Sequence, residues 1–402
     1  MYVGVYSPTA TCTSALDHTV PIGPNDSGTT WPRHRGHRPT THADGVAHSL
    51  QRTPMTRPPS QRGRGSATSG VGTELDTPRH YDRRVDTLKS GPVLLCTDTA
   101  RDRAGDRIRT ICPEVEFVVL GADGVIADDD LMRITHAWFS TDAWPERTPH
   151  YFGACLRSPN LVWFQSFSAG GDNEVFRRLA DNGAEVLFAP GSSATSIAQT
   201  VMMDALALVR GLVHFRRAQA EHRWAPLLTR DLADLRLGVI GLGAIGAEVA
   251  RLAGAFGMDV VGTRRTPTGT EPCECWTDDR RDEVLARSDV VVVAAPLNDD
   301  TRHSIGSAEF ALMPTGSYFI NVGRGEIVVE DDLIDALRND HLAGAGLDVF
   351  AVEPLPATSP LWDMEQVIIT PHSSGTTDRS IRAADDVFLA NWAQTVNTTH
   401  RH

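Results

Sequence analysis

The chain has 402 residues, 41% of them hydrophobic, and a formal net charge of −13 from 38 Lys and Arg against 51 Asp and Glu. This length predicts two domains with substantial cores. No uninterrupted apolar run reaches the roughly 18 residues of a membrane span, and an acidic chain binds nucleic acid poorly, so we expect neither a membrane nor a nucleic acid as partner.

The first 90 residues differ in composition from the rest. They are rich in Pro, Gly, Ser, Thr, Arg and His, and they show no sustained period of 2 or 3.6. They hold 11 Lys and Arg against 7 Asp and Glu, which leaves 27 against 44 for the remainder. They lack the apolar stretch or amphipathic helix of a targeting peptide. For residues 1–90 we therefore predict a disordered extension, or a translation start placed too far upstream.

Six cysteines are scattered along the chain without the spacing of a disulfide framework. Cys273 and Cys275 lie close together but lack the second pair that a structural zinc site needs. We expect reduced thiols, no bound metal and a cytoplasmic location.

Regular structure is predicted to begin near Val93. Apolar runs predict five strands, at 93–96, 116–121, 134–140, 161–168 and 184–189. Strands that alternate with helices form a parallel sheet, so residues 91–225 are assigned to a first, smaller α/β domain. Its fourth strand runs into Ala169-Gly170-Gly171, a loop whose flexible backbone can offer N–H donors to an anion.

A helix predicted from Ser196 to Ala220 is apolar on two faces, and both faces need a partner. One stripe consists of Ile197, Val201, Ala205, Leu208, Leu212 and Phe215, and the other of Met202, Leu206, Val209 and Val213. If one face packs on a second copy of the chain, the protein is a homodimer. The alternative, a core helix wedged between two domains of one chain, is equally well supported. Asp204 and Arg210 exclude a membrane span.

The stretch from Leu237 to Ala253, LGVIGLGAIGAEVARLA, predicts a buried strand, a glycine-rich turn and a helix. Gly241 permits the tight turn, Gly243 lets a dinucleotide pyrophosphate approach the backbone, and Gly246 lets the helix pack closely on the strand. The phosphates would bind the N–H groups at the helix N-terminus. The pattern therefore predicts a dinucleotide-binding unit.

The next strand, 259–262, ends at Thr263, and Arg264, Arg265 and Thr266 follow. NAD sites usually place Asp or Glu here to accept hydrogen bonds from the ribose hydroxyls. Two guanidinium groups cannot accept those bonds but suit a 2′-phosphate, so we predict NADP, with NAD as the alternative. The competing interpretation is that both arginines belong to a solvated loop and that selectivity is lax.

Four further strands are predicted, at 290–296, 317–323, 342–350 and 366–371, so residues 226–372 form a doubly wound sheet. Ligands bind such sheets beyond the carboxyl ends of the strands. Strand-end residues there are Arg324, Asp348 with Glu353, and His372. A proton donor, a carboxylate that orients it and a cation for an anionic substrate make a complete hydride-transfer site.

At this point the chain resembles the D-isomer-specific 2-hydroxyacid dehydrogenases. The resemblance covers about Val93 to the end. It is carried by GLGAIG at 241–246, PLNDDTRHSI at 296–305, NVGRGEIV at 321–328, GLDVFAVEP at 346–354 and ITPHSSG at 369–375.

The resemblance implies two Rossmann-like parallel-sheet domains with an active-site cleft between them, the first domain being completed by residues 373–402. It implies that Arg324 binds the substrate carboxylate and carbonyl, and that Glu353 pairs with His372, the acid/base. The substrate carboxylate would also meet the Ala169-Gly170-Gly171 loop, and Asp348 would meet the nicotinamide side of the cofactor. The other implied cofactor contacts are Leu242, Ala244, Ile245, Pro296, Thr301, Val322 and Gly323.

Within the family, Arg264 and Arg265 resemble the glyoxylate and hydroxypyruvate reductase branch, whose members often use NADPH. Formate dehydrogenase is disfavoured, since it pairs its histidine with glutamine where this chain has Glu353. We predict an enzyme that reduces a small 2-oxo acid to the D-2-hydroxy acid. The alternatives are a dinucleotide-sensing binding protein like the corepressors of this fold, and a dehydrogenase of a bulkier 2-oxo acid.

Overall fold

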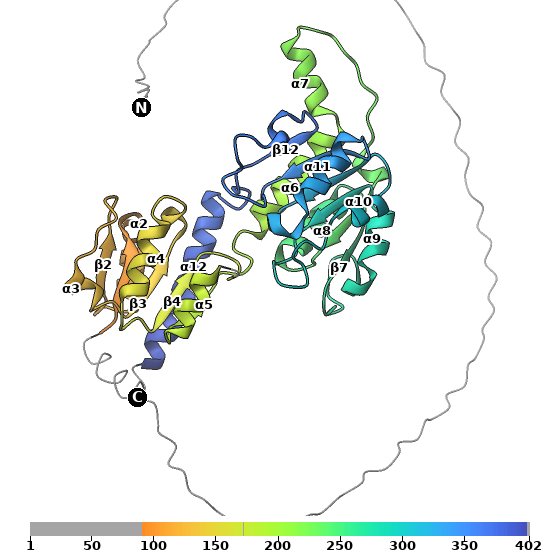
Figure 1. Cartoon of the computed structure of the whole chain (residues 1–402). Coiled ribbons are helices and arrows are strands. Elements are labelled where there is room, and N and C mark those ends of the chain that lie inside the picture. Colours follow the sequence, from red (N-terminus) through yellow and green to blue (C-terminus); the bar gives the residue numbers. More distant parts are fainter. Residues whose placement is uncertain (1–90, 172, 400–402) are drawn as a thin grey trace, which may run out of the picture. The chain divides into compact units, whose positions relative to one another are not determined.

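The computed structural model describes residues 91–171 and 173–399. The predictions made for residues 1–90 lie outside this range. The described residues form two parallel sheets, each covered by helices, so the predicted fold class is confirmed (Figure 1).

The first sheet has five parallel strands in the order β2-β1-β3-β4-β5. The strands are β1 (Val93–Thr97), β2 (Glu116–Leu120), β3 (His136–Phe139), β4 (Trp163–Ser166) and β5 (Glu185–Leu187). The helices are α2 (Asp98–Ile111), α3 (Asp128–Leu131), α4 (Thr148–Arg157) and α5 (Glu174–Asp181), with the 3-10 turn η2 (Thr141–Ala143) after β3. All five predicted strands are present, most of them shorter than predicted because the pairing ends where each loop begins.

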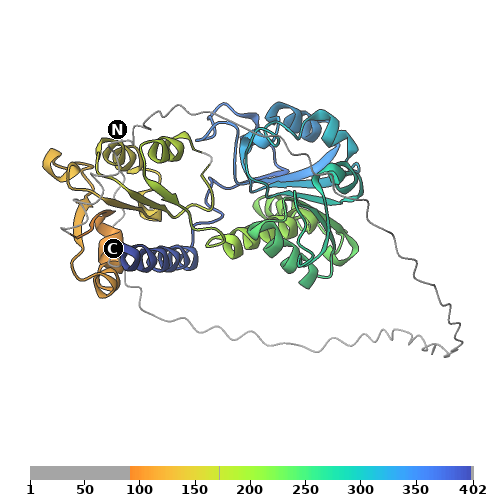
Figure 2. The same ribbon diagram turned by 90° about the horizontal axis from the view of Figure 1, so that it is seen from below.

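The C-terminal helix α12 (Asp378–Thr399) returns to this sheet and lies beside α2 (Figures 1 and 2). Its Phe388 stacks on Trp138 of β3, with ring centroids 4.1 Å apart. Trp392 packs edge-on against Trp163 of β4. All four aromatic side chains are buried, so α12 supplies part of the core of the first sheet.

The second sheet has seven parallel strands in the order β12-β11-β10-β9-β6-β7-β8. They are β6 (Arg236–Ile240), β7 (Asp259–Thr263), β8 (Glu274–Trp276), β9 (Val290–Val293), β10 (Ser317–Asn321), β11 (Leu342–Leu347) and β12 (Val367–Ile369). The short edge strand β8 was not predicted, because three residues with one apolar side chain facing the core carry no readable period.

Helices cover both faces of this sheet, as a doubly wound fold requires. One face packs on α6 (Ala194–Val209) and α8 (Ala244–Ala255). The other packs on α9 (Arg281–Arg287), α10 (Ser307–Leu312) and α11 (Glu330–Arg338). The 3-10 turns η3 (Leu232–Asp234), η4 (Asp278–Arg280), η5 (Gly325–Ile327) and η6 (Pro360–Asp363) lie in its loops.

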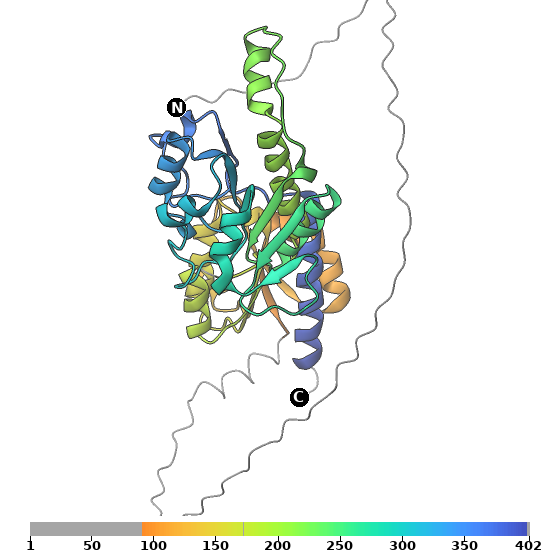
Figure 3. The same cartoon turned by 90° about the vertical axis from the view of Figure 1, so that its right-hand side faces the viewer.

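The prediction of one helix from Ser196 to Ala220 was wrong in its continuity. The chain forms α6 and then α7 (Leu212–Ala220), which meet at an angle of 64°. Gly211 stands at the break with φ +66°, a left-handed conformation that glycine adopts without a Cβ clash. Helix α7 therefore extends away from the sheet (Figure 3). Among the described residues no single helix is long and apolar enough to cross a membrane, and α6 and α7 pass that test only as this bent pair.

Candidate active site

The loop between β6 and α8 has the geometry that its glycines predict. Gly241 has φ +98°, and a Cβ there would lie 2.7 Å from the backbone of Ala295. A Cβ on Gly246 would lie 2.2 Å from the carbonyl oxygen of Gly241, so α8 packs against the strand only with glycine here. A Cβ on Gly243 would meet open space. The first N–H groups of α8, which include those of Ala244 and Ile245, have no intrahelical acceptor and can bind a phosphate.

Leu242 differs from the other predicted contacts in this loop. Its side chain is buried and its N–H donates to the carbonyl of Thr263 at 2.7 Å. The buried side chain and the N–H of Leu242 therefore both hold the loop against β7.

The loop after β7 carries the two predicted arginines in different settings. Arg264 donates through Nη1 to Glu271 at 3.2 Å. The Arg265 side chain is 73% exposed and lies 3.6 Å from Asp300, whose side chain is 87% exposed. Thr266 is exposed beside them. No carboxylate occupies residues 263–266, and the carboxylates paired with the two arginines, Glu271 and Asp300, come from other positions.

His372 and Glu353 form a close pair of titratable groups at the carboxyl end of this sheet. His372 Nδ1 lies 2.7 Å from Glu353 Oε2, and the other carboxylate oxygen accepts the Phe350 N–H at 3.0 Å. Burial would raise the pKa of Glu353, but the hydrogen bond to His372, its charge and the Phe350 N–H together hold it below the ordinary value. Glu353 is thus ionised and orients the imidazole through Nδ1.

Asp348 lies under the histidine loop. Its buried carboxylate accepts the Thr370 hydroxyl at 2.6 Å, the Ser373 N–H at 2.9 Å, and both the N–H and the hydroxyl of Ser374. The His372 N–H donates to the Asp348 carbonyl at 2.8 Å, and His372 itself has φ +51°. These bonds hold the histidine in a strained backbone conformation. Asp348 therefore fixes the loop that carries His372. Its implied contact with the nicotinamide remains a prediction.

The remaining predicted cofactor residues form the loops after β9 and β10. Thr301 donates its hydroxyl to the Pro296 carbonyl at 2.7 Å and closes the first loop. A Cβ on Gly323 would lie 2.8 Å from the Ala295 carbonyl, so Val322-Gly323 passes close to the end of β9. Arg324 follows, and its Nη1 donates to the Gly323 carbonyl at 2.7 Å.

The loop after β4 is compact. The Ser168 hydroxyl donates to the Gly170 carbonyl at 2.9 Å, and a Cβ on Gly171 would lie 2.1 Å from the Phe188 ring. The close approach of Phe188 explains why glycine stands at 171, and the turn leaves Ala169 and Gly170 on the surface of a cavity.

That cavity, of about 470 Å³, gathers residues from the loops of both sheets. The predicted residues that line it are Ala169, Gly170, Ile245, Val322, Arg324, Asp348, Glu353 and His372. The other predicted cofactor residues lie outside its lining, at the carboxyl ends of β6, β7, β9 and β10.

Trp144 also lines this cavity and was not predicted. Its ring lies edge-on to His372, with centroids 6.3 Å apart. The signal was available, since Trp144 follows a predicted strand at its carboxyl end, where parallel sheets place functional side chains. The aromatic rings of Phe139, Phe152 and Phe167 line the same wall.

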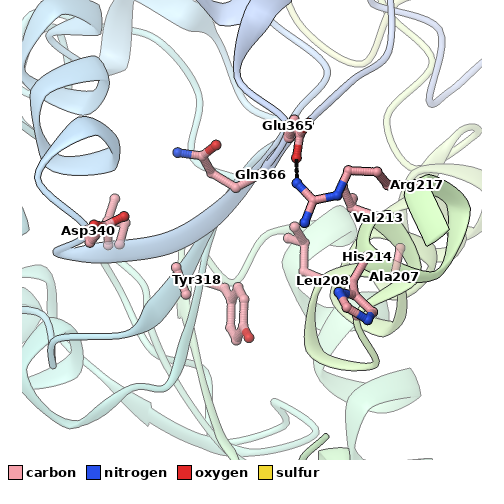
Figure 4. Close-up of a pocket in the computed structure, with 12 residues that line it drawn as sticks. Ala207, Leu208, Val213, His214, Arg217, Tyr318, Asp340, Glu365 and Gln366 are labelled. Atoms are coloured by element: carbon pink, nitrogen blue, oxygen red, sulfur yellow. Dashed lines mark hydrogen bonds and ion pairs between the residues drawn. The ribbon is translucent and has the colours of Figure 1, made fainter. Parts of the chain in front are cut away.

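A second cavity, of about 340 Å³, lies where strands β10, β11 and β12 begin, at the opposite end of the strands (Figure 4). Arg217 of α7 pairs with Glu365 there at 2.6 Å, and His214 Nε2 lies 3.2 Å from the Ala225 carbonyl. These contacts attach α7 to the sheet and its return loop. No predicted site residue lines this cavity.

Comparison with known proteins identifies relatives of this chain. The family model for the D-isomer specific 2-hydroxyacid dehydrogenase NAD-binding domain matches residues 202–374. A glyoxylate/hydroxypyruvate reductase B from Yersinia enterocolitica is 33% identical over 230 residues, which cover 55% of this chain and 70% of the relative.

Two solved structures extend the likeness over both sheets. A D-isomer specific 2-hydroxyacid dehydrogenase from Xanthobacter autotrophicus Py2, in complex with NADPH and MES, is 32% identical with a TM-score of 0.62, over 76% of this chain and 96% of that one. D-lactate dehydrogenase from Aquifex aeolicus, complexed with NAD and lactic acid, is 25% identical with a TM-score of 0.63, over 77% and 96%.

Proposed function

Because this chain belongs to the D-isomer specific 2-hydroxyacid dehydrogenase family, oxidoreductases that act on CH–OH groups with a nicotinamide dinucleotide, we propose that it reduces a small 2-oxo acid to the D-2-hydroxy acid. The substrate we favour is of the glyoxylate or hydroxypyruvate type. The observation that carries the proposal is the His372–Glu353 pair, which lines one cavity with Arg324.

The nicotinamide dinucleotide, held by the Gly241–Gly246 loop and the edge beside it, would supply the hydride to the carbonyl carbon. Hydride addition leaves negative charge on the carbonyl oxygen, and His372 donates a proton to that oxygen from Nε2. The ionised Glu353 holds the ring in place through Nδ1. The roles reverse in the oxidation, where neutral His372 accepts the proton.

Arg324 is the cation for the substrate in this proposal. Its planar guanidinium can bind the carboxylate through two parallel N–H bonds and leave a donor for the carbonyl oxygen. The backbone of Ala169 and Gly170 faces the same cavity and would bind the other carboxylate oxygen. Trp144 and the rings of Phe139, Phe152 and Phe167 add apolar surface to the lining of this cavity.

The test is a panel of 2-oxo acids of increasing size, from glyoxylate and hydroxypyruvate to branched and aromatic acids, each assayed with NADPH and NADH. We expect the highest kcat/KM with the two smallest acids. If kcat/KM were highest with a branched or aromatic acid, the proposed substrate class would be wrong and the bulkier 2-oxo acids would take its place. No turnover in the panel, with tight dinucleotide binding, would favour a sensing role.

We propose NADP as the preferred cofactor. The proposal is supported by the guanidinium groups at the end of β7, and by the absence of a carboxylate at residues 263–266 that could accept the ribose hydroxyls. Replacing both Arg264 and Arg265 with Gln should raise KM for NADPH at least tenfold and leave KM for NADH within about twofold, because only NADPH carries the 2′-phosphate. Equal increases for both cofactors would contradict the preference.

We propose that two copies associate through the outer face of α6 and α7. Large apolar side chains remain exposed there, namely Met203 of α6 and Leu212 and Phe215 of α7, and Phe256 at the end of α8 is also exposed. The return loop after α7 carries two that are almost fully exposed, Trp224 and Leu228. Exposed apolar surface of this kind marks association sites. Sedimentation velocity should show a dimer, and Phe215→Asp should shift it toward monomer. A monomeric wild type at micromolar concentration would refute the dimer.

Two assignments from the sequence also remain proposals. Residues 91–225 with 373–402 form the substrate domain and residues 226–372 the dinucleotide domain; the buried contacts of α12 with the first sheet support the first of these. A cytoplasmic location is supported by the five cysteines among the described residues, all of them free thiols: Cys96, Cys112, Cys155, Cys273 and Cys275.

A further inference from the structure

In the loop that follows β7, the carboxylate of Glu271 binds several other loop residues. The sequence analysis did not predict a role for it. Glu271 stands seven residues after Arg264 and just before the edge strand β8. Its side chain is only 4% exposed, although it belongs to a surface loop. A charged group buried to this extent needs partners.

Glu271 has such partners on both carboxylate oxygens. Oε1 accepts the Thr268 N–H and the Thr268 hydroxyl, both at 2.8 Å, and Arg264 Nη1 at 3.2 Å. Oε2 accepts the Gly269 N–H at 2.9 Å. The backbone and hydroxyl of Thr268 are the main reason that the pKa of Glu271 is lowered to about 2. The carboxylate is therefore ionised at any working pH.

The bonds of Glu271 therefore connect the end of the loop to its start at Arg264 and to its middle at Thr268 and Gly269. At one end the Arg264 N–H donates to the Trp276 carbonyl of β8 at 2.9 Å, so the backbone of Arg264 is fixed to the sheet. Its side chain, 41% exposed, is then directed by Glu271. In the middle of the loop Gly269 has φ +78°, which lets the backbone turn back toward the same carboxylate.

We propose that Glu271 is a positioning residue for cofactor selectivity: it orders the 264–271 loop and aims Arg264 at the 2′-phosphate of NADPH. The inference rests on the NADP preference proposed above. Glu271 acts through Arg264 and the loop backbone and touches no part of the cofactor itself. The opposite expectation is that a carboxylate beside a phosphate site repels the phosphate, so the two interpretations predict opposite signs.

The test is calorimetric binding of two fragments to the full chain, 2′,5′-ADP, which carries the 2′-phosphate, and 5′-AMP, which lacks it. Glu271→Gln keeps the shape but removes the charge that orders Arg264. We expect it to weaken 2′,5′-ADP about tenfold and to leave 5′-AMP within about twofold, with kcat at saturating NADPH unchanged. Glu274→Gln is the matched control, because Glu274 is an acidic neighbour on β8 that accepts the Trp276 Nε1–H and, among the described residues, makes no hydrogen bond to the 264–271 loop.

A second arm tests whether Glu271 acts through Arg264. In an Arg264→Gln background, adding Glu271→Gln should change 2′,5′-ADP binding by less than twofold. Tighter 2′,5′-ADP binding in Glu271→Gln would show repulsion and overturn the inference, and equal weakening of both fragments would show general loop damage and overturn it too. A wild type that binds both fragments equally would overturn the NADP proposal first, whereas a selective wild type with an indifferent Glu271→Gln variant overturns only the role of Glu271.

Discussion

The two parallel sheets use the same position in opposite ways. In each, strand order reverses beside the first strand, between β6 and β9 in the seven-stranded sheet and between β1 and β3 in the five-stranded sheet. Doubly wound sheets form a crevice for ligands at this switch point. In the seven-stranded sheet it carries the glycine loop, whose outward surface at Gly243 is open. In the five-stranded sheet the switch point is occupied by charged side chains that pair with one another.

The filled switch point is a network around Asp142. Its carboxylate accepts the hydroxyls of Thr97, at the end of β1, and Ser140, just after β3, at 2.6 and 2.7 Å. It also accepts Arg147 Nη2 at 2.8 Å. Arg103 of α2 lies 3.5 Å from Asp142 and donates through Nε and Nη2 to the buried Asp385 of α12, at 2.6 and 3.0 Å.

Topology alone therefore locates a crevice and does not say whether it binds a ligand. Where positively and negatively charged side chains pair at the switch point, this position contributes to stability. Where backbone N–H groups remain open, as at Gly243, it can bind a cofactor, and the catalytic residues lie at other strand ends of the same sheet. The comparison predicts that variants of the first kind lose stability and variants of the second kind lose turnover.

The largest effect is expected at His372. His372→Ala should lower kcat about 10³-fold, since a positioned general acid contributes roughly 10²–10⁴, while the Kd for NADPH and the melting temperature stay close to wild type. Stopped-flow turnover, fluorescence titration and thermal denaturation measure the three quantities, with His150→Ala, at an exposed histidine on α4, as the control. An undiminished kcat would remove the catalytic assignment from His372.

Arg324→Lys comes next. Lysine keeps the positive charge but loses the planar pair of donors, so kcat/KM for the 2-oxo acid should fall about 100-fold, or roughly 2.7 kcal/mol. Arg338→Lys on the exposed side of α11 is the control. Near wild-type kcat/KM would mean that a point charge suffices.

In the filled crevice, Arg103→Met should lower the free energy of unfolding by about 2–3 kcal/mol, because the buried Asp385 loses the partner of both its oxygens. NADPH affinity should not change. Urea denaturation measures the loss. Arg107→Met is the matched control one helical turn away, where the pair with Asp386 is exposed on both sides and should contribute less than about 1 kcal/mol. Equal losses in the two variants would contradict the contrast drawn between the sheets.

The smallest effect concerns Asp204 of α6, which is buried against Gly346 of β11 with Oδ1 unpartnered among the described side chains. Burial, with the charge of Asp348, raises its pKa to about 7. The folded state thus holds a proton that the unfolded chain releases near pH 4, so stability should fall as pH rises from about 4 to about 7. Asp204→Asn should flatten that decline by roughly 2 kcal/mol between pH 5 and 8. Asp231→Asn, on an exposed carboxylate, is the control, and parallel stability curves for wild type and Asp204→Asn would refute the assignment.

The sequence by itself determined the features that depend on neighbours along the chain. Apolar runs located both sheets, and the glycine spacing located the β6–α8 turn, because each signal lies within one element and its loop. Motif order further indicated Arg324, Glu353 and His372 as one set.

Only the tertiary structure decided what depends on contacts between distant residues. The Arg103–Asp385 pair spans 282 positions, and Trp144 reaches His372 from a different sheet. The break at Gly211 was missed because one glycine in a helical pattern does not reveal whether packing or a bend places it there. Glu271 was missed because the sequence of a polar loop does not show whether a carboxylate is solvated or enclosed by the loop backbone. Hydrophobic patterning is a local property, whereas the pairing of charges is set by which loops the folded sheets bring together.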